Sequence, residues 1–228
     1  MFRYLLLPAA LLLCLPLFSQ QEIKSVDNTV REDIEWANLW WAHAPDTKLP
    51  RVLLIGDSVT NGYHNDVDKL LKGKVNVDMV ATSANICDPA LLAQVRLAVG
   101  GYKHAVIHFN NGLHGWQLDD AAYEAGLSRL IALLRELSPQ AKLVWGHSTP
   151  IVLTTDPATL DPKNAAVIRR NEIAARVMQE LGIPVDDTYS VSVGHPEYRN
   201  VGDGYHYNQQ GKTAQAEAVA KAIIPLLP

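Results

Sequence analysis

Short apolar runs alternate with longer amphipathic stretches along most of the chain. Residues typical of turns bound each run, which predicts buried strands at residues 52–55, 75–80, 105–109, 143–145 and 183–185. Apolar residues recur at a spacing near 3.6 between the runs, which predicts helices at residues 66–71, 89–99, 123–137, 164–181 and 208–224. This alternation predicts an α/β fold, a doubly wound, flavodoxin-like sheet of five parallel strands with helices on both faces.

Two stretches lie outside this alternation. Residues 27–41 predict a further helix, and we interpret its tryptophans, Trp36, Trp40 and Trp41, as packing against the domain rather than binding substrate. Residues 154–162 predict a loop.

Asn171 stands among the inward-facing apolar residues of the helix predicted at 164–181. A buried amide must find hydrogen-bond partners or it destabilises the fold by about 1–3 kcal/mol. We therefore expect Asn171 to brace the loop after the fourth strand.

The first twenty residues have the pattern of a secretory signal. One positive charge at Arg3 precedes an apolar stretch at residues 5–18, which is short for a membrane span and is followed by polar residues. We expect a signal peptide over 1–20, a single domain over 21–228, a secreted or periplasmic location, and no stable membrane insertion after signal removal.

Charge and cysteine content narrow the function classes. The net charge of −4 is slight and negative, so it does not indicate a nucleic-acid-binding protein. Cys14 falls within the signal, so Cys87 would be the only cysteine of the mature chain and no internal disulfide can form. We interpret Cys87 as buried and inert rather than as a nucleophile.

Polar residues follow the predicted strands, and in a doubly wound sheet those positions meet at one edge. These loops contain Gly56-Asp57-Ser58, Ser83-Ala84-Asn85, Asn110-Asn111, His147 and Asp203-Gly204-Tyr205-His206. A hydroxyl, amides and an Asp/His pair are the parts that acyl transfer by a serine nucleophile requires. Each motif alone is common in turns, but their joint placement at loop ends favours a hydrolase.

With these motifs the chain resembles the SGNH/GDSL hydrolase family from about residue 50 onward. The resemblance implies that Ser58 is the nucleophile, His206 the general base and Asp203 the residue that orients His206. It also implies an oxyanion hole formed by the Ser58 amide and the Asn111 side chain, with Asp57 beside them.

The chain departs from the family pattern at two places. The family's glycine after the second strand is replaced, so the third oxyanion donor would be the Ala84 amide or the Asn85 side chain. The block after the third strand reads Phe109-Asn110-Asn111-Gly112, which leaves Asn110 as an alternative to Asn111.

The remaining histidines raise the alternative of a zinc site, with His108 and His114 near Asp57. No HExxH or comparable spacing is present, so neither a metal nor another cofactor is expected. We interpret His108 as a hydrogen-bonded core residue and His114 as part of the pocket lining.

The leading hypothesis is a serine esterase that hydrolyses O-acyl esters, with O-acetylated carbohydrate as the favoured substrate. Trp116 and Tyr205 are expected near the site, where they would stack on a sugar ring. A lipid acyl hydrolase or thioesterase of the same fold is the nearest alternative, although no long apolar lid is evident. A non-catalytic carbohydrate-binding protein is the alternative from another class.

Overall fold

Five parallel strands form the centre of the main sheet. The computed structural model describes residues 30–228. The parallel strands lie in the order β3 (Asn76–Thr82), β2 (Arg51–Gly56), β4 (Val106–Phe109), β5 (Lys142–Gly146) and β8 (Val185–Asp186). This is the flavodoxin-like order, so the predicted doubly wound fold is confirmed.

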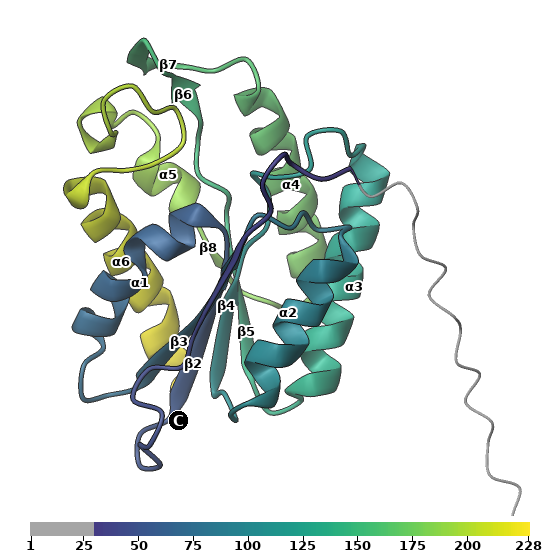
Figure 1. Ribbon diagram of the computed structural model, residues 1–228, viewed down its shortest axis with the longest axis vertical. Helices are drawn as coiled ribbons and strands as arrows, with labels where there is room; N and C mark the ends of the chain where they lie inside the picture. The colour runs from purple at the N-terminus through teal and green to yellow at the C-terminus, as the bar shows by residue number, and fades with distance from the viewer. Residues whose placement is uncertain (1–29) are drawn as a thin grey trace, which may run out of the picture.

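The helices divide between the two faces of the sheet (Figure 1). One face carries α1 (Ser58–Leu70), the short α5 (Thr188–Ser192) and α6 (Gln209–Ile223), and the other carries α2 (Pro89–Gly100), α3 (Asp120–Leu137) and α4 (Asn164–Leu181). Single 3₁₀ turns lie at Pro196–Tyr198 and Ile224–Leu226. No helix among residues 30–228 combines the length and apolar character needed to cross a bilayer.

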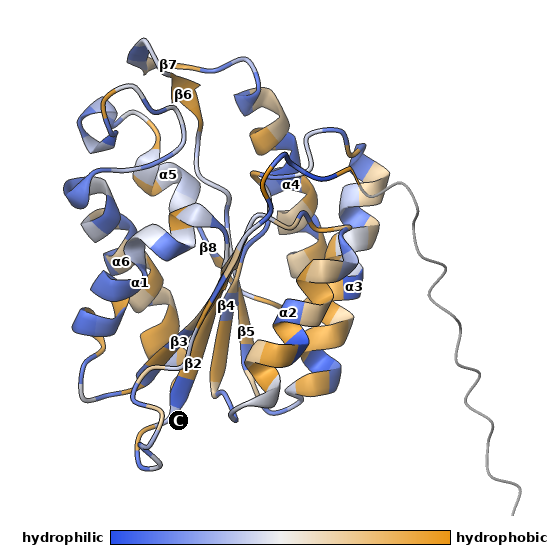
Figure 2. Ribbon diagram, viewed as in Figure 1, coloured by the Kyte–Doolittle hydropathy of each residue, from blue (hydrophilic) through white to orange (hydrophobic). Residues whose placement is uncertain are grey.

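The sheet separates two hydrophobic clusters. Leu53 and Ile55 of β2 pack towards α2 and α3, while Val52 and Leu54 of the same strand pack towards α1 and α6. In Figure 2 the hydrophobic residues gather along the central strands and on α2 and α3, whereas α1 is mostly pale or blue. A strand that is buried on both faces fixes its own register, so β2 is a rigid base for the residues that follow it.

The register brings the ends of the central strands level. Ile55 of β2 pairs with Val80 of β3 and with Phe109 of β4, so the three following loops emerge at one edge of the sheet. Gly56 then allows α1 to start close to the strand, because a Cβ there would lie 2.0 Å from Thr60 Oγ1.

The helix predicted at residues 27–41 is wrong over the part that the structure describes. An antiparallel edge strand, β1 (Ala37–Trp40), occupies it and pairs Leu39 with Val80. The tryptophan spacing suits a helix face, but β1 is set by backbone pairing with β3, which no local pattern reports. Trp41 packs as expected, with its indole N–H bonded to the Ala98 carbonyl at 3.2 Å. Trp40 does not, because it is 56% exposed.

Two further elements differ from the prediction. α1 begins at Ser58 rather than at residue 66, because Val59, Tyr63 and Val67 form a buried face that intervening polar residues hid. The loop predicted at 154–162 contains β7 (Asp156–Leu160), an exposed strand that forms a hairpin with β6 (Val152–Leu153).

The other predicted strands and helices are present, with every end within three residues of the predicted one. The predicted signal peptide lies outside the described residues.

Candidate active site

Ser58 is the first residue of α1, directly beyond the buried strand β2. The Asp57 side chain caps the helix, because its Oδ1 accepts a hydrogen bond from the Val59 amide at 2.9 Å. Asp57 is buried and caps the helix rather than facing the rim. The Ser58 backbone N–H therefore belongs to the helix N-terminus, where the helix dipole favours a negative charge.

Three side chains form a continuous hydrogen-bonded chain at this edge. The Oγ of Ser58 lies 2.8 Å from His206 Nε2, and His206 Nδ1 lies 2.7 Å from Asp203 Oδ2. Ser58 and His206 are 148 positions apart in the sequence, so only the fold brings them together. A hydroxyl on one ring nitrogen and a carboxylate on the other is the arrangement that activates a serine nucleophile.

Asp203 is held as an anion by its own loop. Burial opposes its ionisation, but backbone donors and His206 together keep the pKa of this carboxyl below its ordinary value. The backbone donors are the amides of Tyr205 and His206, at 2.8 and 3.0 Å from Oδ1. The remaining oxygen, Oδ2, is therefore directed at the imidazole.

The two asparagines after β4 point in different directions. Asn111 is buried, and its Nδ2 donates to the Ala84 carbonyl at 2.9 Å, which places it beside the loop that follows β3. Asn110 turns the other way and donates to the Gly146 carbonyl at 2.7 Å and to Ser148 Oγ at 3.1 Å. Of the two, Asn111 keeps an N–H available on the β3 side.

Of the two expected third oxyanion donors, the Ala84 amide is engaged, because it donates to Thr82 Oγ1 at 3.0 Å. The Asn85 side chain accepts from the Cys87 amide at 3.0 Å and donates one N–H to the Val30 carbonyl at 3.3 Å. Like Asn111, Asn85 therefore keeps a second N–H. The loop after β3 positions Asn111 through the Ala84 carbonyl.

The sequence model of the GDSL-like Lipase/Acylhydrolase family matches residues 54–214, which include Ser58, Asn111, Asp203 and His206. The chain belongs to this family. It is a carboxylic ester hydrolase of the GDSL type.

Solved structures share the fold of this GDSL-type hydrolase at low sequence identity. An aryl esterase from M. smegmatis has a TM-score of 0.65 at 14% identity, covering 78% of this chain and 100% of its own. An acetylxylan esterase from Geobacillus stearothermophilus has a TM-score of 0.62 at 17% identity, covering 76% and 94%. A GDSL-like lipase from Bacteroides thetaiotaomicron has a TM-score of 0.59 at 17% identity, covering 78% and 89%. No curated protein matches the chain.

Arg170 is a residue of this hydrolase that the sequence analysis missed. It is buried on α4, and its guanidinium donates to the carbonyls of Gly112, His114 and Gly115 at 2.6–2.9 Å. Tyr123, on whose ring Arg170 packs, donates its hydroxyl to the Asn111 carbonyl at 2.9 Å. These bonds fix the loop that carries Asn111.

The signal for Arg170 was its place on the helix. It lies three residues after Val167, on the same inward stripe as Asn171. Asn171 is buried as predicted, and it exchanges two 2.9 Å hydrogen bonds with the backbone of Ser148. The expected brace for the loop after β5 is therefore present.

The expected pocket residues are only partly open to solvent. His114 Nδ1 lies 2.6 Å from Glu32 Oε1, so it holds the segment before β1 against the rim. The Arg170 guanidinium lies over the Trp116 ring, 5.1 Å from its centre. It therefore covers part of the ring surface that was expected to stack on a sugar. Tyr205 is half-buried and adjoins the triad through its amide.

The groups considered for other chemistry are engaged in the fold. His108 is buried with its Nε2 3.0 Å from Asp186 Oδ2, so its core position is confirmed. Cys87 is half-buried rather than fully buried, and its thiol donates to the Ala122 carbonyl at 3.2 Å. Within residues 30–228 no group of three His, Cys, Asp or Glu side chains could hold a metal ion.

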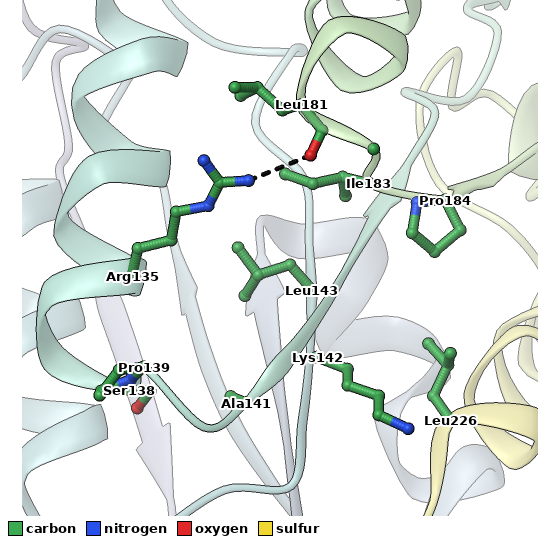
Figure 3. Close-up of a pocket in the computed structure, with 11 residues that line it drawn as sticks. Arg135, Ser138, Pro139, Ala141, Lys142, Leu143, Leu181, Ile183, Pro184 and Leu226 are labelled. Atoms are coloured by element: carbon green, nitrogen blue, oxygen red, sulfur yellow. Dashed lines mark hydrogen bonds between the residues drawn. The ribbon is translucent and has the colours of Figure 1, made fainter.

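A cavity of about 520 Å³ lies at the opposite end of the sheet. Figure 3 shows it between the start of β5, at Lys142 and Leu143, and the end of α4, at Leu181. Arg135 of α3 donates to the Leu181 carbonyl there, at 3.1 Å. Catalytic loops follow the carboxyl ends of parallel strands, and this cavity adjoins the amino end of β5. Despite its size, this cavity is therefore too far from the catalytic loops to be the reaction site.

Proposed function

We propose that this GDSL-type hydrolase removes short acyl groups, above all acetyl, from carbohydrates through an acyl-enzyme on Ser58. The observation that supports the mechanism is the hydrogen bond between Ser58 Oγ and His206 Nε2, continued to Asp203. No other hydroxyl in the described part of the chain is bonded to such an Asp/His pair.

The chemistry follows from this arrangement in two halves. In the first, Ser58 Oγ attacks the ester carbonyl carbon while His206 Nε2 takes the hydroxyl proton. The carbon–oxygen bond to the alcohol then breaks, and the imidazolium gives its proton to the leaving oxygen. In the second half a water molecule loses a proton to His206 and attacks the acyl-enzyme, which releases the carboxylic acid and restores the Ser58 hydroxyl.

Negative charge forms on the carbonyl oxygen in both tetrahedral states. The Ser58 amide, at the positive end of α1, and the second N–H of Asn111 are the donors for this charge. Asp203 orients His206 and stabilises the imidazolium without taking its proton.

Two observations support the substrate class. The cavity beside Ser58 is lined mainly by residues with amide, hydroxyl or ionisable side chains. Its less polar side chains are Val59 and the buried Tyr207. A lining with so few apolar side chains suits a hydroxyl-rich alcohol better than a lipid chain. The acetylxylan esterase among the structural neighbours shows the fold with that activity in another protein.

The test is a panel of esters with Ser58→Ala as the control. We expect p-nitrophenyl acetate to be hydrolysed faster than the butyrate, and the butyrate much faster than the dodecanoate. We also expect acetate release from acetylated oligosaccharides. Turnover that rises with chain length would identify a lipid acyl hydrolase instead, and turnover that survives in Ser58→Ala would exclude the serine mechanism.

The cellular location is part of the same proposal. An N-terminal signal over residues 1–20 would direct the hydrolase to the periplasm or the medium, where polysaccharide esters are found. Expression of the full chain followed by fractionation tests this. Recovery of the protein in the periplasm or medium, shortened at its N-terminus, supports secretion, and an uncleaved cytoplasmic protein contradicts it.

A further inference from the structure

A polar pocket of about 310 Å³ opens directly beside the catalytic serine, between α1 and α6. The groups of its lining that can bind a ligand are Ser58, Asn61, Asn200, His206, Lys212 and Gln215. Neither Ala84 nor Asn111 belongs to this lining. The pocket therefore lies on the His206 side of the nucleophile, away from the donors for the carbonyl oxygen.

This position assigns the pocket to one half of the ester. The carbonyl oxygen must face Asn111 and the Ser58 amide, whereas the leaving oxygen must lie next to His206 Nε2, which protonates it. A group that continues from the leaving oxygen enters the pocket that His206 lines. The pocket is thus placed to hold the alcohol part of the substrate.

One residue of the lining has a buried acceptor without a partner in the described part of the chain. Gln215 is 1% exposed, and its Oε1 has no hydrogen-bond partner within residues 30–228. Its Nε2 donates to Ser192 Oγ at 3.2 Å, which fixes the plane of the amide. Asn61 Oδ1 accepts from Asn38 at 3.3 Å, so the Asn61 amide N–H groups are directed elsewhere. A buried acceptor without a partner costs free energy, and a substrate hydroxyl that donates to it removes that cost.

Lys212 adds a positive charge that no carboxylate of residues 30–228 pairs within 4.0 Å. Its stem lies over Gly62, where a Cβ would be 3.4 Å from Lys212 Cε. Asp66 lies within electrostatic reach, but Lys69 and Gln209 already occupy its two oxygens. Asp203 in the lining is likewise bonded through both oxygens. The ammonium is therefore available to an anion in the pocket.

We propose that this pocket is a subsite for the alcohol part of an acidic carbohydrate, with Lys212 binding a carboxylate and Gln215 and Asn61 binding hydroxyls. The proposal rests on the esterase function above and specifies its substrate as a uronate-containing, acylated sugar. Amides are suited to hydroxyls, and a single ammonium beside them selects a sugar with one negative charge near the ester.

The test compares two substrates that differ only in charge. One is an acetylated, uronate-containing oligosaccharide, and the other is the same compound with its carboxylates reduced to primary alcohols. We expect a kcat/KM about tenfold higher for the acidic compound, because one charge-assisted bond is gained at a half-exposed site. This preference should decline as NaCl is raised, since salt screens such a contact.

The variant Lys212→Met removes the charge and keeps the length of the stem. We expect it to abolish the preference by raising KM for the acidic substrate about tenfold, with kcat little changed. Lys221→Met, an exposed lysine of the same helix outside the pocket, is the matched control and should retain the preference. Asn61→Ala should raise KM for both substrates, because hydroxyl binding does not depend on the charge.

The outcomes separate this proposal from the esterase function. Equal kcat/KM for the two glycans, or a preference that survives in Lys212→Met, overturns the acidic subsite while the esterase function stands. Hydrolysis of p-nitrophenyl acetate with neither glycan cleaved also overturns the subsite. Failure to hydrolyse any ester overturns the esterase proposal, and the subsite with it.

Discussion

Aspartate–histidine pairs of nearly equal length occur at the rim and in the interior of this hydrolase. The rim pair, Asp203–His206, measures 2.7 Å, and the interior pair, Asp78–His104, measures 2.9 Å. The interior side chains are both 0% exposed and are joined by Arg51, whereas those of the rim pair are 32% and 43% exposed. Only the rim histidine contacts a serine hydroxyl. The length of the Asp–His hydrogen bond therefore does not identify a catalytic histidine. A catalytic histidine is identified by contact with a reactive group and by access for the substrate.

The largest expected difference between the two regions is in catalysis. We expect His206→Gln to lower kcat/KM for p-nitrophenyl acetate by about 10⁴-fold, because no other base among residues 30–228 contacts Ser58. His104→Gln should leave kcat/KM of the folded protein within about threefold, since it removes only a buried contact far from the rim. A large loss of turnover in folded His104→Gln would break the comparison.

The next largest effect distinguishes the two asparagines beside Ser58. Asn111→Ala should lower kcat by about 100- to 1000-fold with little change in KM, because the charge that it stabilises exists only in the tetrahedral state. Asn110→Ala should have a much smaller effect on kcat, since its side chain is bonded to Gly146 and Ser148. Steady-state kinetics on p-nitrophenyl acetate measure both, and a reversed order would assign the oxyanion to Asn110.

The interior pair should instead determine stability. Asp78→Asn leaves the buried Arg51 without its anion, and breaking a buried ion pair typically costs about 3–5 kcal/mol of unfolding free energy. Denaturant unfolding at neutral pH measures this loss, and kcat of the folded fraction should be retained. Asp203→Asn should show the opposite result, with a small change in the denaturation midpoint and a severe loss of kcat.

The two carboxylates also differ in what acid does to each. Burial opposes ionisation of Asp78, but hydrogen bonds from His104 and Arg51 hold its pKa below the ordinary value. A depressed folded-state pKa gives stability that is complete above the unfolded value, about 3.9, and is lost as the pH falls through the folded one. Acid unfolding of the wild type should thus include a contribution that Asp78→Asn lacks.

At the rim, acid should act on turnover rather than on folding. Burial opposes ionisation of Asp203, but backbone amides and the His206 ring hold its pKa below the ordinary value, so this carboxyl is ionised at the pH of the assay. We expect kcat/KM to fall towards acid pH, because the general base must be able to accept the serine proton. A pH–rate profile from 4.5 to 8.5, at constant ionic strength, measures this, and a kcat/KM that stays constant over that range would contradict the general-base role.

The sequence predicted the parts of the fold whose signals are local. Strands buried on both faces, such as β2, appear as continuous apolar runs, and α3 and α4 show regular amphipathic spacing. Ser58, Asn111, Asp203 and His206 could be placed at one edge because parallel strands bring the following loops together.

The elements that the sequence did not predict depend on contacts between distant segments. β1 exists because its backbone pairs with β3, and its tryptophans imitate a helix face. The loss of the Ala84 amide as an oxyanion donor depends on Thr82, whose side-chain position no motif reports. Arg170 was missed because its hydrogen bonds all go to backbone carbonyls, so no charged partner in the sequence indicates that it is buried.

Ser58 should form the acyl-enzyme, and His206 should be the histidine that activates it. A serine-directed fluorophosphonate followed by peptide mass spectrometry tests it most directly. We expect one adduct per chain, located on Ser58, formed at the wild-type rate in folded His104→Gln and slowed by at least about a thousandfold in His206→Gln. An adduct on another residue, or labelling of His206→Gln at the wild-type rate, would contradict it.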